Sequence, residues 1–103
     1  MKDQSLKAIL DLDRVVHEPA RLAILTVLSA AEEVEFLFLL KVTGLSKGNL
    51  SAQAQKLEAA GYLQTIKAFR GRVPVTSFRM TDEGRSALLA YHAQMRALLP
   101  GRK

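Results

Sequence analysis

The sequence predicts a mainly α-helical domain with one small β-hairpin near its C-terminal end. Apolar residues recur at helical spacing over most of residues 4–60, and the pattern changes to alternation over residues 62–80. A long apolar stripe at helical spacing returns over about residues 81–99. With 103 residues and 49% apolar composition, the chain is long enough for one domain, residues 1–103, and little more.

Two helices are predicted in the first third of the chain. An apolar stripe indicates a first helix over about residues 4–16. In the following stretch, HEPARLAILTVL, Pro19 suits the first turn of a second helix because its missing N–H is not needed there. His17 is expected to cap the entry to this helix, and the nearby acidic residues are expected to form local ion pairs with Arg14 and Arg21.

Two further helices are predicted on either side of a short turn. Residues 34–36 favour a short strand, and the third helix that follows should end at Gly44. Ser46 is a good N-cap for the fourth helix, which Gly61 should end. Residues 36–60 therefore predict a helix-turn-helix. The buried face of its second helix should consist of Leu50, Ala54 and Leu57.

A hairpin and a last helix complete the chain. YLQTIKAF is rich in β-forming residues, FRGRVP supplies a turn, and VTSFRM alternates again, so residues 62–80 predict a hairpin. Thr81 is a good N-cap for the last helix, residues 81–99, and its first turn carries Asp82 and Glu83, which the helix dipole favours. A helix-turn-helix followed directly by a hairpin is the winged-helix layout.

Three stretches carry a resemblance to a known family. HEPARLAIL resembles the entry to the second helix of single-domain winged helix-turn-helix regulators of the MarR/ArsR-like group. GLSKGNLSAQAQKLEAAGYL is similar to their turn and recognition helix, and FRGRVPVTSFRMTDEGRSAL to their wing and its exit. Together these stretches span about residues 17–90. The resemblance implies a homodimeric transcriptional regulator that binds a specific sequence of double-stranded DNA.

The distribution of charge agrees with a polyanionic partner. Residues 45–103 hold ten lysines and arginines against three acidic residues, whereas residues 1–44 hold five against seven. The basic excess is therefore confined to the part of the chain that contains the predicted recognition helix and wing. A basic surface that only keeps the protein soluble is the alternative explanation.

The predicted recognition helix, residues 46–60, should enter the major groove. Asparagine and glutamine can pair with adenine edges, and serine can bind phosphate or base. The candidate DNA contacts on this helix are Ser46, Lys47, Asn49, Ser51, Gln53 and Lys56. Relatives often carry arginine or histidine where this chain has Ala52 and Gln53, so base readout should be spread over several residues. An ordinary surface helix with local caps is the alternative.

The wing should lie at the minor groove, through residues 67–74. Its candidate DNA contacts are Lys67, Arg70 and Arg72. An arginine at the tip of a hairpin can enter a narrow A·T-rich minor groove, and Arg72 is the first choice for this role. Alternatively, these charges could only protect an exposed sheet edge from pairing with another chain.

The first and last helices carry apolar stripes that the resemblance assigns to a dimer interface. The candidate interface residues are Leu6, Ile9, Leu10, Leu88, Tyr91, His92, Met95 and Leu99. A two-fold dimer would place two recognition helices about 34 Å apart and would bind a pseudo-palindromic site. The alternative is that the stripes pack onto their own domain.

Other classes of function receive no support from the sequence. There is no cysteine and there are two histidines, so thiolate metal sites are excluded and no metal or cofactor is expected. No catalytic motif is present, so we expect no enzyme activity. The most apolar stretch, VEFLFLL, is too short to cross a membrane, and we expect a cytoplasmic protein without a signal peptide. A winged-helix module that binds a protein partner is the alternative function, and no effector is indicated.

Overall fold

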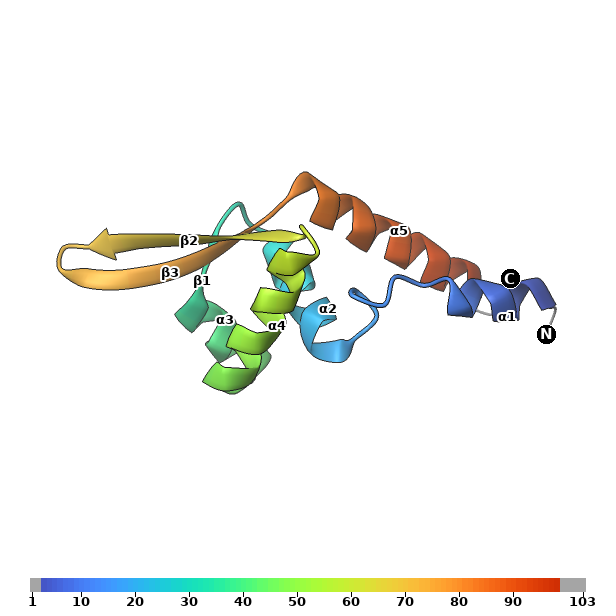
Figure 1. The fold of residues 1–103 in the computed structure, drawn as a ribbon, viewed down its shortest axis with the longest axis horizontal. Coiled ribbons are helices and arrows are strands. Elements are labelled where there is room, and N and C mark those ends of the chain that lie inside the picture. Colours follow the sequence, from blue (N-terminus) through green and yellow to red (C-terminus); the bar gives the residue numbers. More distant parts are fainter. Residues whose placement is uncertain (1–2, 99–103) are drawn as a thin grey trace.

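The computed structural model describes residues 3–98 as an elongated molecule of 58 × 24 × 23 Å. Its elements are α1 (Asp3–Leu10), α2 (Pro19–Leu28), β1 (Val34–Glu35), α3 (Phe36–Thr43), α4 (Lys47–Ala59), β2 (Leu63–Arg70), β3 (Val73–Met80) and α5 (Asp82–Leu98). The hairpin of β2 and β3 projects at one end, α1 lies at the other, and α2, α3 and α4 lie between them (Figure 1). This arrangement is the predicted winged-helix layout.

The core lies where α2, α3 and α4 meet. Its fully buried side chains are Val16, Ile24, Leu25, Leu28, Leu39, Leu50 and Leu57. Phe78 and Met80 of β3 and Leu88 and Tyr91 of α5 close this core from the side of the sheet and of the last helix. Burial of so many aliphatic side chains is the main favourable contribution to folding of a domain of this size.

The three strands form one antiparallel sheet in the order β1-β3-β2. In the hairpin Arg70 pairs with Val73, so the connection consists of two residues, Gly71 and Arg72. Gly71 has a φ of 66°, a left-handed conformation that glycine adopts without steric cost. At the base of the hairpin Val34 pairs with Phe78, which ties the short strand to the core.

The predicted ends of the helix-turn-helix are confirmed. Gly44 ends α3 in the left-handed region with a φ of 73°, and its N–H donates to the carbonyl of Leu40. The hydroxyl of Ser46 caps α4 by accepting the N–H of Asn49 at 3.1 Å. Gly61, with a φ of 82°, follows the end of α4 and turns the chain into β2.

The prediction of a first helix over residues 4–16 is wrong at its C-terminal end, because α1 ends at Leu10. The Asp13 carboxylate accepts the N–H groups of Val15 at 2.8 Å and Val16 at 3.2 Å. An aspartate that binds the backbone in this way competes with the helical hydrogen bonds. The chain therefore forms a loop over residues 11–18, which brings Val16 into the core.

The expected roles of the charged residues in this loop are also corrected. Glu18, and not His17, caps α2, because its carboxylate accepts the N–H of Arg21 at 2.8 Å. His17 instead lies with its Nδ1 2.7 Å from the hydroxyl of Tyr91. Within residues 3–98 the ion pairs are Arg70–Glu35 and Arg79–Glu33, so the expected pairs of Arg14 and Arg21 do not form.

The first turn of α5 packs against the backbone that follows α4. Thr81 Oγ1 accepts the N–H of Gly84 at 3.0 Å, as its predicted cap role requires, and donates to the carbonyl of Gly61 at 2.6 Å. The N–H of Thr81 donates to the carbonyl of Tyr62. A Cβ atom on Gly84 would lie only 2.1 Å from that carbonyl oxygen, so this crossing requires glycine.

Gly84→Ala should therefore lower the free energy of unfolding by about 1–3 kcal/mol, because the backbone must move to admit the methyl group. Urea denaturation measures this change. Gly48→Ala is the matched control, since a Cβ there meets nothing within 4 Å. It should leave stability equal to that of the parent or raise it by up to about 1 kcal/mol. Parent-like stability of Gly84→Ala would contradict the close approach.

Tyr62 links the end of α4 to the loop over residues 11–18. Its hydroxyl donates to Asp13 Oδ2, while Oδ1 of the same carboxylate accepts the backbone bonds of that loop. This hydrogen bond, followed by burial and by the charges of Asp13 and Glu83, raises the pKa of Tyr62 from 10.0 to about 12. The protonated phenol is therefore favoured in the folded state.

Tyr62→Phe should lower the free energy of unfolding at pH 8 by about 1 kcal/mol, because Asp13 loses its partner. In the parent this contribution is complete below pH 10.0 and is lost as pH rises toward about 12, the pKa in the folded state. The stability difference between the two proteins should therefore shrink over that interval. Urea unfolding at several alkaline pH values tests this, and a constant difference would contradict it.

Candidate nucleic-acid interface

Helix α4 turns one apolar face into the core and leaves the rest in solvent. Leu50, Ala54 and Leu57 are buried, as the spacing predicted. Gln53 is half-buried, and the other predicted contacts of this helix are exposed: Ser46, Lys47, Asn49, Ser51 and Lys56. The first turn of α4 lies at the free lower edge of the molecule in Figure 1. The end of the helix that would read bases is thus accessible.

Two of the predicted base-reading side chains are hydrogen-bonded to each other. Gln53 Nε2 donates to Asn49 Oδ1 at 3.0 Å, one helical turn away. Gln53 Oε1 accepts from Arg21 Nη1 at 2.7 Å. Arg21 was not predicted as a site residue, because the sequence placed it at the start of the second helix and assigned it to a local ion pair. No local signal could have found it, since it lies 32 positions from Gln53.

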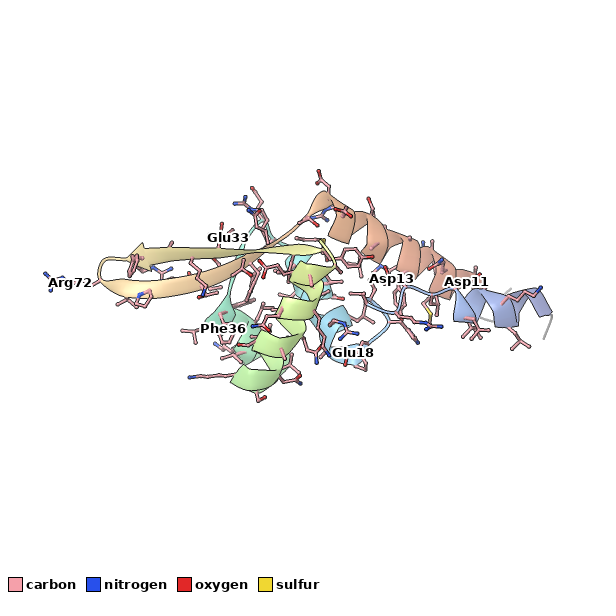
Figure 2. The ribbon with its side chains drawn as sticks, viewed as in Figure 1. Asp11, Asp13, Glu18, Glu33, Phe36 and Arg72 are labelled. Atoms are coloured by element: carbon pink, nitrogen blue, oxygen red, sulfur yellow. The ribbon has the colours of Figure 1, made fainter. Side chains whose placement is uncertain are left out.

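The basic residues of the wing differ in their surroundings. Figure 2 shows Arg72 at the far end of the hairpin, pointing away from the body of the molecule. Lys67 is exposed on β2. Arg70 is ion-paired with Glu35 of β1, and the two side chains are 70% and 41% exposed. A pair this exposed contributes little free energy, so the guanidinium can exchange Glu35 for another anion at small cost.

A groove of about 600 Å³ lies between α4 and the hairpin. Four predicted contacts line it: Lys47, Ser51, Lys67 and Arg70. The structure therefore brings these residues to one concave surface. Of the other predicted contacts, Arg72 lies at the hairpin tip, and four do not line the groove: Ser46, Asn49, Gln53 and Lys56. Three cationic side chains face two carboxylates in the groove, Glu35 and Glu58, and Glu35 is already paired with Arg70.

Sequence reasoning missed three polar residues that line the same groove. They are Gln55, Thr65 and Thr76. Thr65 and Lys67 are two positions apart on β2, so they point to one face of the hairpin, and Lys67 is paired with Thr76. The alternation of strand residues was therefore the signal that could have identified the two threonines once Lys67 had been singled out.

The predicted dimer residues differ in their exposure. Leu6, Ile9 and Leu10 of α1 are exposed, and so is His92 of α5, whereas Met95 is half-buried. Leu88 and Tyr91 are buried inside this chain, at 3% and 5% exposure. Leu99 lies outside the described residues. The alternative of packing onto the same domain therefore applies to Leu88 and Tyr91, and the exposed surface is provided mainly by α1.

Two other kinds of site were sought among residues 3–98. No group of three or more histidine, cysteine or acidic side chains within it is placed to hold a metal ion. None of the helices within residues 3–98 combines the length and apolar character needed to cross a membrane. The surface that gathers the predicted functional residues is thus the one formed by α4 and the hairpin.

The chain is similar in sequence to known proteins over most of its length. The model of a family described as "Winged helix DNA-binding domain" matches residues 20–99. An uncharacterized protein of Methanocaldococcus jannaschii is 34% identical over 79 residues, which cover 76% of this chain and 85% of that protein. The matched residues include all of α4 and the hairpin.

Solved structures share the arrangement. A transcriptional regulator homologue from Pyrococcus horikoshii OT3 superposes with a TM-score of 0.83 at 28% identity, covering 92% of this chain and 93% of that one. A MarR-family transcriptional regulator from Silicibacter pomeroyi has a TM-score of 0.66 at 18% identity, covering 91% of this chain and 62% of that one. At this lower identity the likeness shows a common fold. The predicted winged-helix fold is therefore confirmed.

Proposed function

Because the chain belongs to the winged helix DNA-binding domain family, we propose that it regulates transcription by binding a specific site in double-stranded DNA as a homodimer. The observation that carries this proposal is the joint placement of α4 and the basic hairpin. Lys47, Lys67 and Arg70 line one groove and Arg72 lies at the hairpin tip, all on the segment that the family covers. The relative from Pyrococcus horikoshii, described as a transcriptional regulator homologue, supports the regulatory role.

In the proposed complex α4 enters the major groove and one phosphate backbone lies in the groove beside the hairpin. Lys47 and Lys67 then contact phosphates from opposite sides of that groove, and Ser51 donates a hydrogen bond. Gly48 has no side chain, and a Cβ placed there would meet nothing within 4 Å. The backbone on this face of the helix is therefore open to close approach of DNA. Arg72 extends into the adjacent minor groove.

Arg72→Ala and Lys47→Ala should each weaken DNA binding and lower the steepness of its salt dependence. A cation that binds DNA at a phosphate or in the minor groove releases counterions, so each loss should reduce the slope of log K against log salt by about one. Fluorescence anisotropy with labelled genomic duplex fragments, over about 50–200 mM salt, measures this slope.

Arg85→Ala is the matched control. Arg85 is an exposed cation on α5, close to the carbonyl of Ser29 and outside the groove between α4 and the hairpin. Its removal should leave the slope unchanged, which separates a phosphate contact from a general loss of positive charge. The proposed function is overturned if the parent binds no duplex DNA at low salt.

The proposed homodimer forms through α1 and the exposed part of α5. These helices contact each other within the chain. Leu6 and Leu10 of α1 nevertheless remain 51% and 68% exposed, and Leu89 of α5 is 61% exposed. Such apolar surface on one end of a small domain is best removed from water by a second copy. Two copies related by a two-fold axis would then present two α4 helices to a pseudo-palindromic site.

Leu10→Glu should convert a dimer to a monomer, because the carboxylate would be buried without a partner in the interface. Multi-angle light scattering at high micromolar concentration measures the mass. Leu37→Glu on α3 is the matched control, since Leu37 is 67% exposed and Leu10 is 68% exposed. It should leave the dimer intact. A monomer mass for the parent would rule out the homodimer. It would not contradict DNA binding by a single copy, which the salt series tests separately.

Binding to a protein partner is the second candidate function. It is favoured by exposed apolar side chains away from α1: Leu37, Phe38, Val42, Phe69 and Val73. Phe69 and Val73 lie on the hairpin close to its tip, where the DNA proposal places a minor groove. The salt series distinguishes the two functions, because a module that uses this apolar surface would not bind duplex DNA with a steep salt dependence.

A further inference from the structure

Three polar side chains connect the loop before α2 to the exposed face of α4. Arg21 Nη1 donates to Gln53 Oε1 at 2.7 Å, and Gln53 Nε2 donates to Asn49 Oδ1 at 3.0 Å. Arg21 and Gln53 are half-buried, whereas Asn49 is exposed. The chain of hydrogen bonds therefore begins inside the protein and ends at the surface that faces DNA in the proposed complex.

The direction of every bond in this chain follows from its first member. A guanidinium group can only donate hydrogen bonds, so Gln53 must present its oxygen to Arg21. The amide nitrogen of Gln53 then points along the helix to Asn49, which must present its own oxygen. The two hydrogens on Asn49 Nδ2 have no partner among the described residues and remain available for DNA. The side-chain amides of Gln53 and Asn49 could each be flipped by 180°, and the bond from Arg21 selects one of the two orientations for both.

Arg21 is itself held firmly from the protein side. Its Nε donates to the carbonyl of Val15 at 2.7 Å, and Nη2 lies 3.3 Å from the carbonyl of Arg14. Its backbone N–H is bound by the Glu18 carboxylate at 2.8 Å. These contacts belong to the loop over residues 11–18 and to the first turn of α2, so the guanidinium cannot rotate freely toward solvent.

We propose that Arg21 is a positioning residue for base recognition. It orients the amide of Asn49 through Gln53 and so determines which bases Asn49 can bind. The proposal rests on the DNA-binding function proposed above. In this proposal Arg21 does not contact DNA, and the main role of Gln53 is to hold the Asn49 amide in one orientation. Sequence specificity of α4 then depends on a residue outside the helix-turn-helix.

The orientation predicts a class of base. Asn49 offers amide hydrogens, so it should face a base with a major-groove acceptor: N7 of a purine or O4 of thymine. Cytosine presents an amino group where Asn49 presents hydrogens, and it should be disfavoured at this position.

The hydrogen bonds from Arg21 through Gln53 to Asn49 form a relay, and Gln53→Glu tests it by reversing its last bond. The carboxylate still accepts from Arg21, but it has no hydrogen to donate to Asn49. Asn49 must then turn its amide and donate to the carboxylate, which leaves Oδ1 facing the DNA. The preference should shift toward cytosine, which offers an amino group and no acceptor in the major groove, whereas adenine offers both and does not distinguish the two orientations. Selection from a randomised duplex pool should show discrimination altered by about 5- to 150-fold at that position.

Gln55→Glu is the matched control for charge. Gln55 is exposed on the same helix and makes no contact with the relay. Gln53→Glu and Gln55→Glu add the same negative charge beside the phosphates, so both should weaken binding to all sequences. Only Gln53→Glu should change the preferred base. Equal base preferences in the two variants would overturn the relay.

Direct reading by residue 53 is distinguished by a double variant, Asn49→Ala with Gln53→Glu. If orientation passes through Asn49, the double variant should select no base at this position. A double variant that still selects cytosine would show that residue 53 reads the base itself, which also overturns the proposal.

Arg21→Met completes the test, because it removes the donor and frees both amides to adopt either orientation. Discrimination at the Asn49 position should become weaker, while preferences at other positions persist. Unchanged discrimination would overturn the role of Arg21. Thermal unfolding checks that this variant is folded, and if it is not, the Gln53 variants decide the matter. A parent that selects no sequence at all would instead remove the proposed function.

Discussion

The burial of one face of α4 is the constraint on which the rest of the structure depends. Leu50 and Leu57 are completely buried and Ala54 is nearly so, which fixes the rotation of the helix about its axis. With that rotation fixed, the polar face has only one direction in which to point. The hairpin and α5 close the same core, and their positions relative to α4 follow from the packing of Phe78 and Leu88. A change of rotation would move every candidate DNA contact at once.

The loop over residues 11–18 supports α4 from the side opposite the hairpin. Asp13 binds the backbone of its own loop and the hydroxyl of Tyr62, which follows the end of α4. Arg21 binds carbonyl groups of the same loop and then Gln53 in the middle of α4. Polar side chains therefore connect the loop to α4 at two points, where a purely apolar contact would allow rotation or sliding. Such directional bonds suit a helix that must present amides in one orientation.

The distribution of charge on the surface follows from the way α4, the hairpin and the loop over residues 11–18 pack together. Acidic side chains that precede α4 in the chain are mostly used to cap, to pair or to bind backbone, as Glu18, Glu35 and Asp13 show. Basic side chains of α4 and the hairpin remain largely exposed, and three of them, Lys47, Lys67 and Arg70, line one groove. The charge asymmetry of the sequence thus becomes a spatial asymmetry, with the cations concentrated at the surface that we propose binds phosphates.

The sequence by itself determined the order of the elements, the glycines that end α3 and α4 (Gly44 and Gly61), and the buried face of α4. These features depend on residues close together in the chain: apolar spacing, capping hydroxyls and glycine in the left-handed region. Only the tertiary structure decided that α1 ends at Leu10, that Leu88 and Tyr91 are core residues, and that Arg21 reaches Gln53. The burial of Leu88 and Tyr91 and the reach of Arg21 depend on contacts between distant segments, and Asp13 adds to its local backbone bonds a hydrogen bond from Tyr62, which lies 49 positions away. A charged or apolar side chain carries no local signal of which distant partner it will meet.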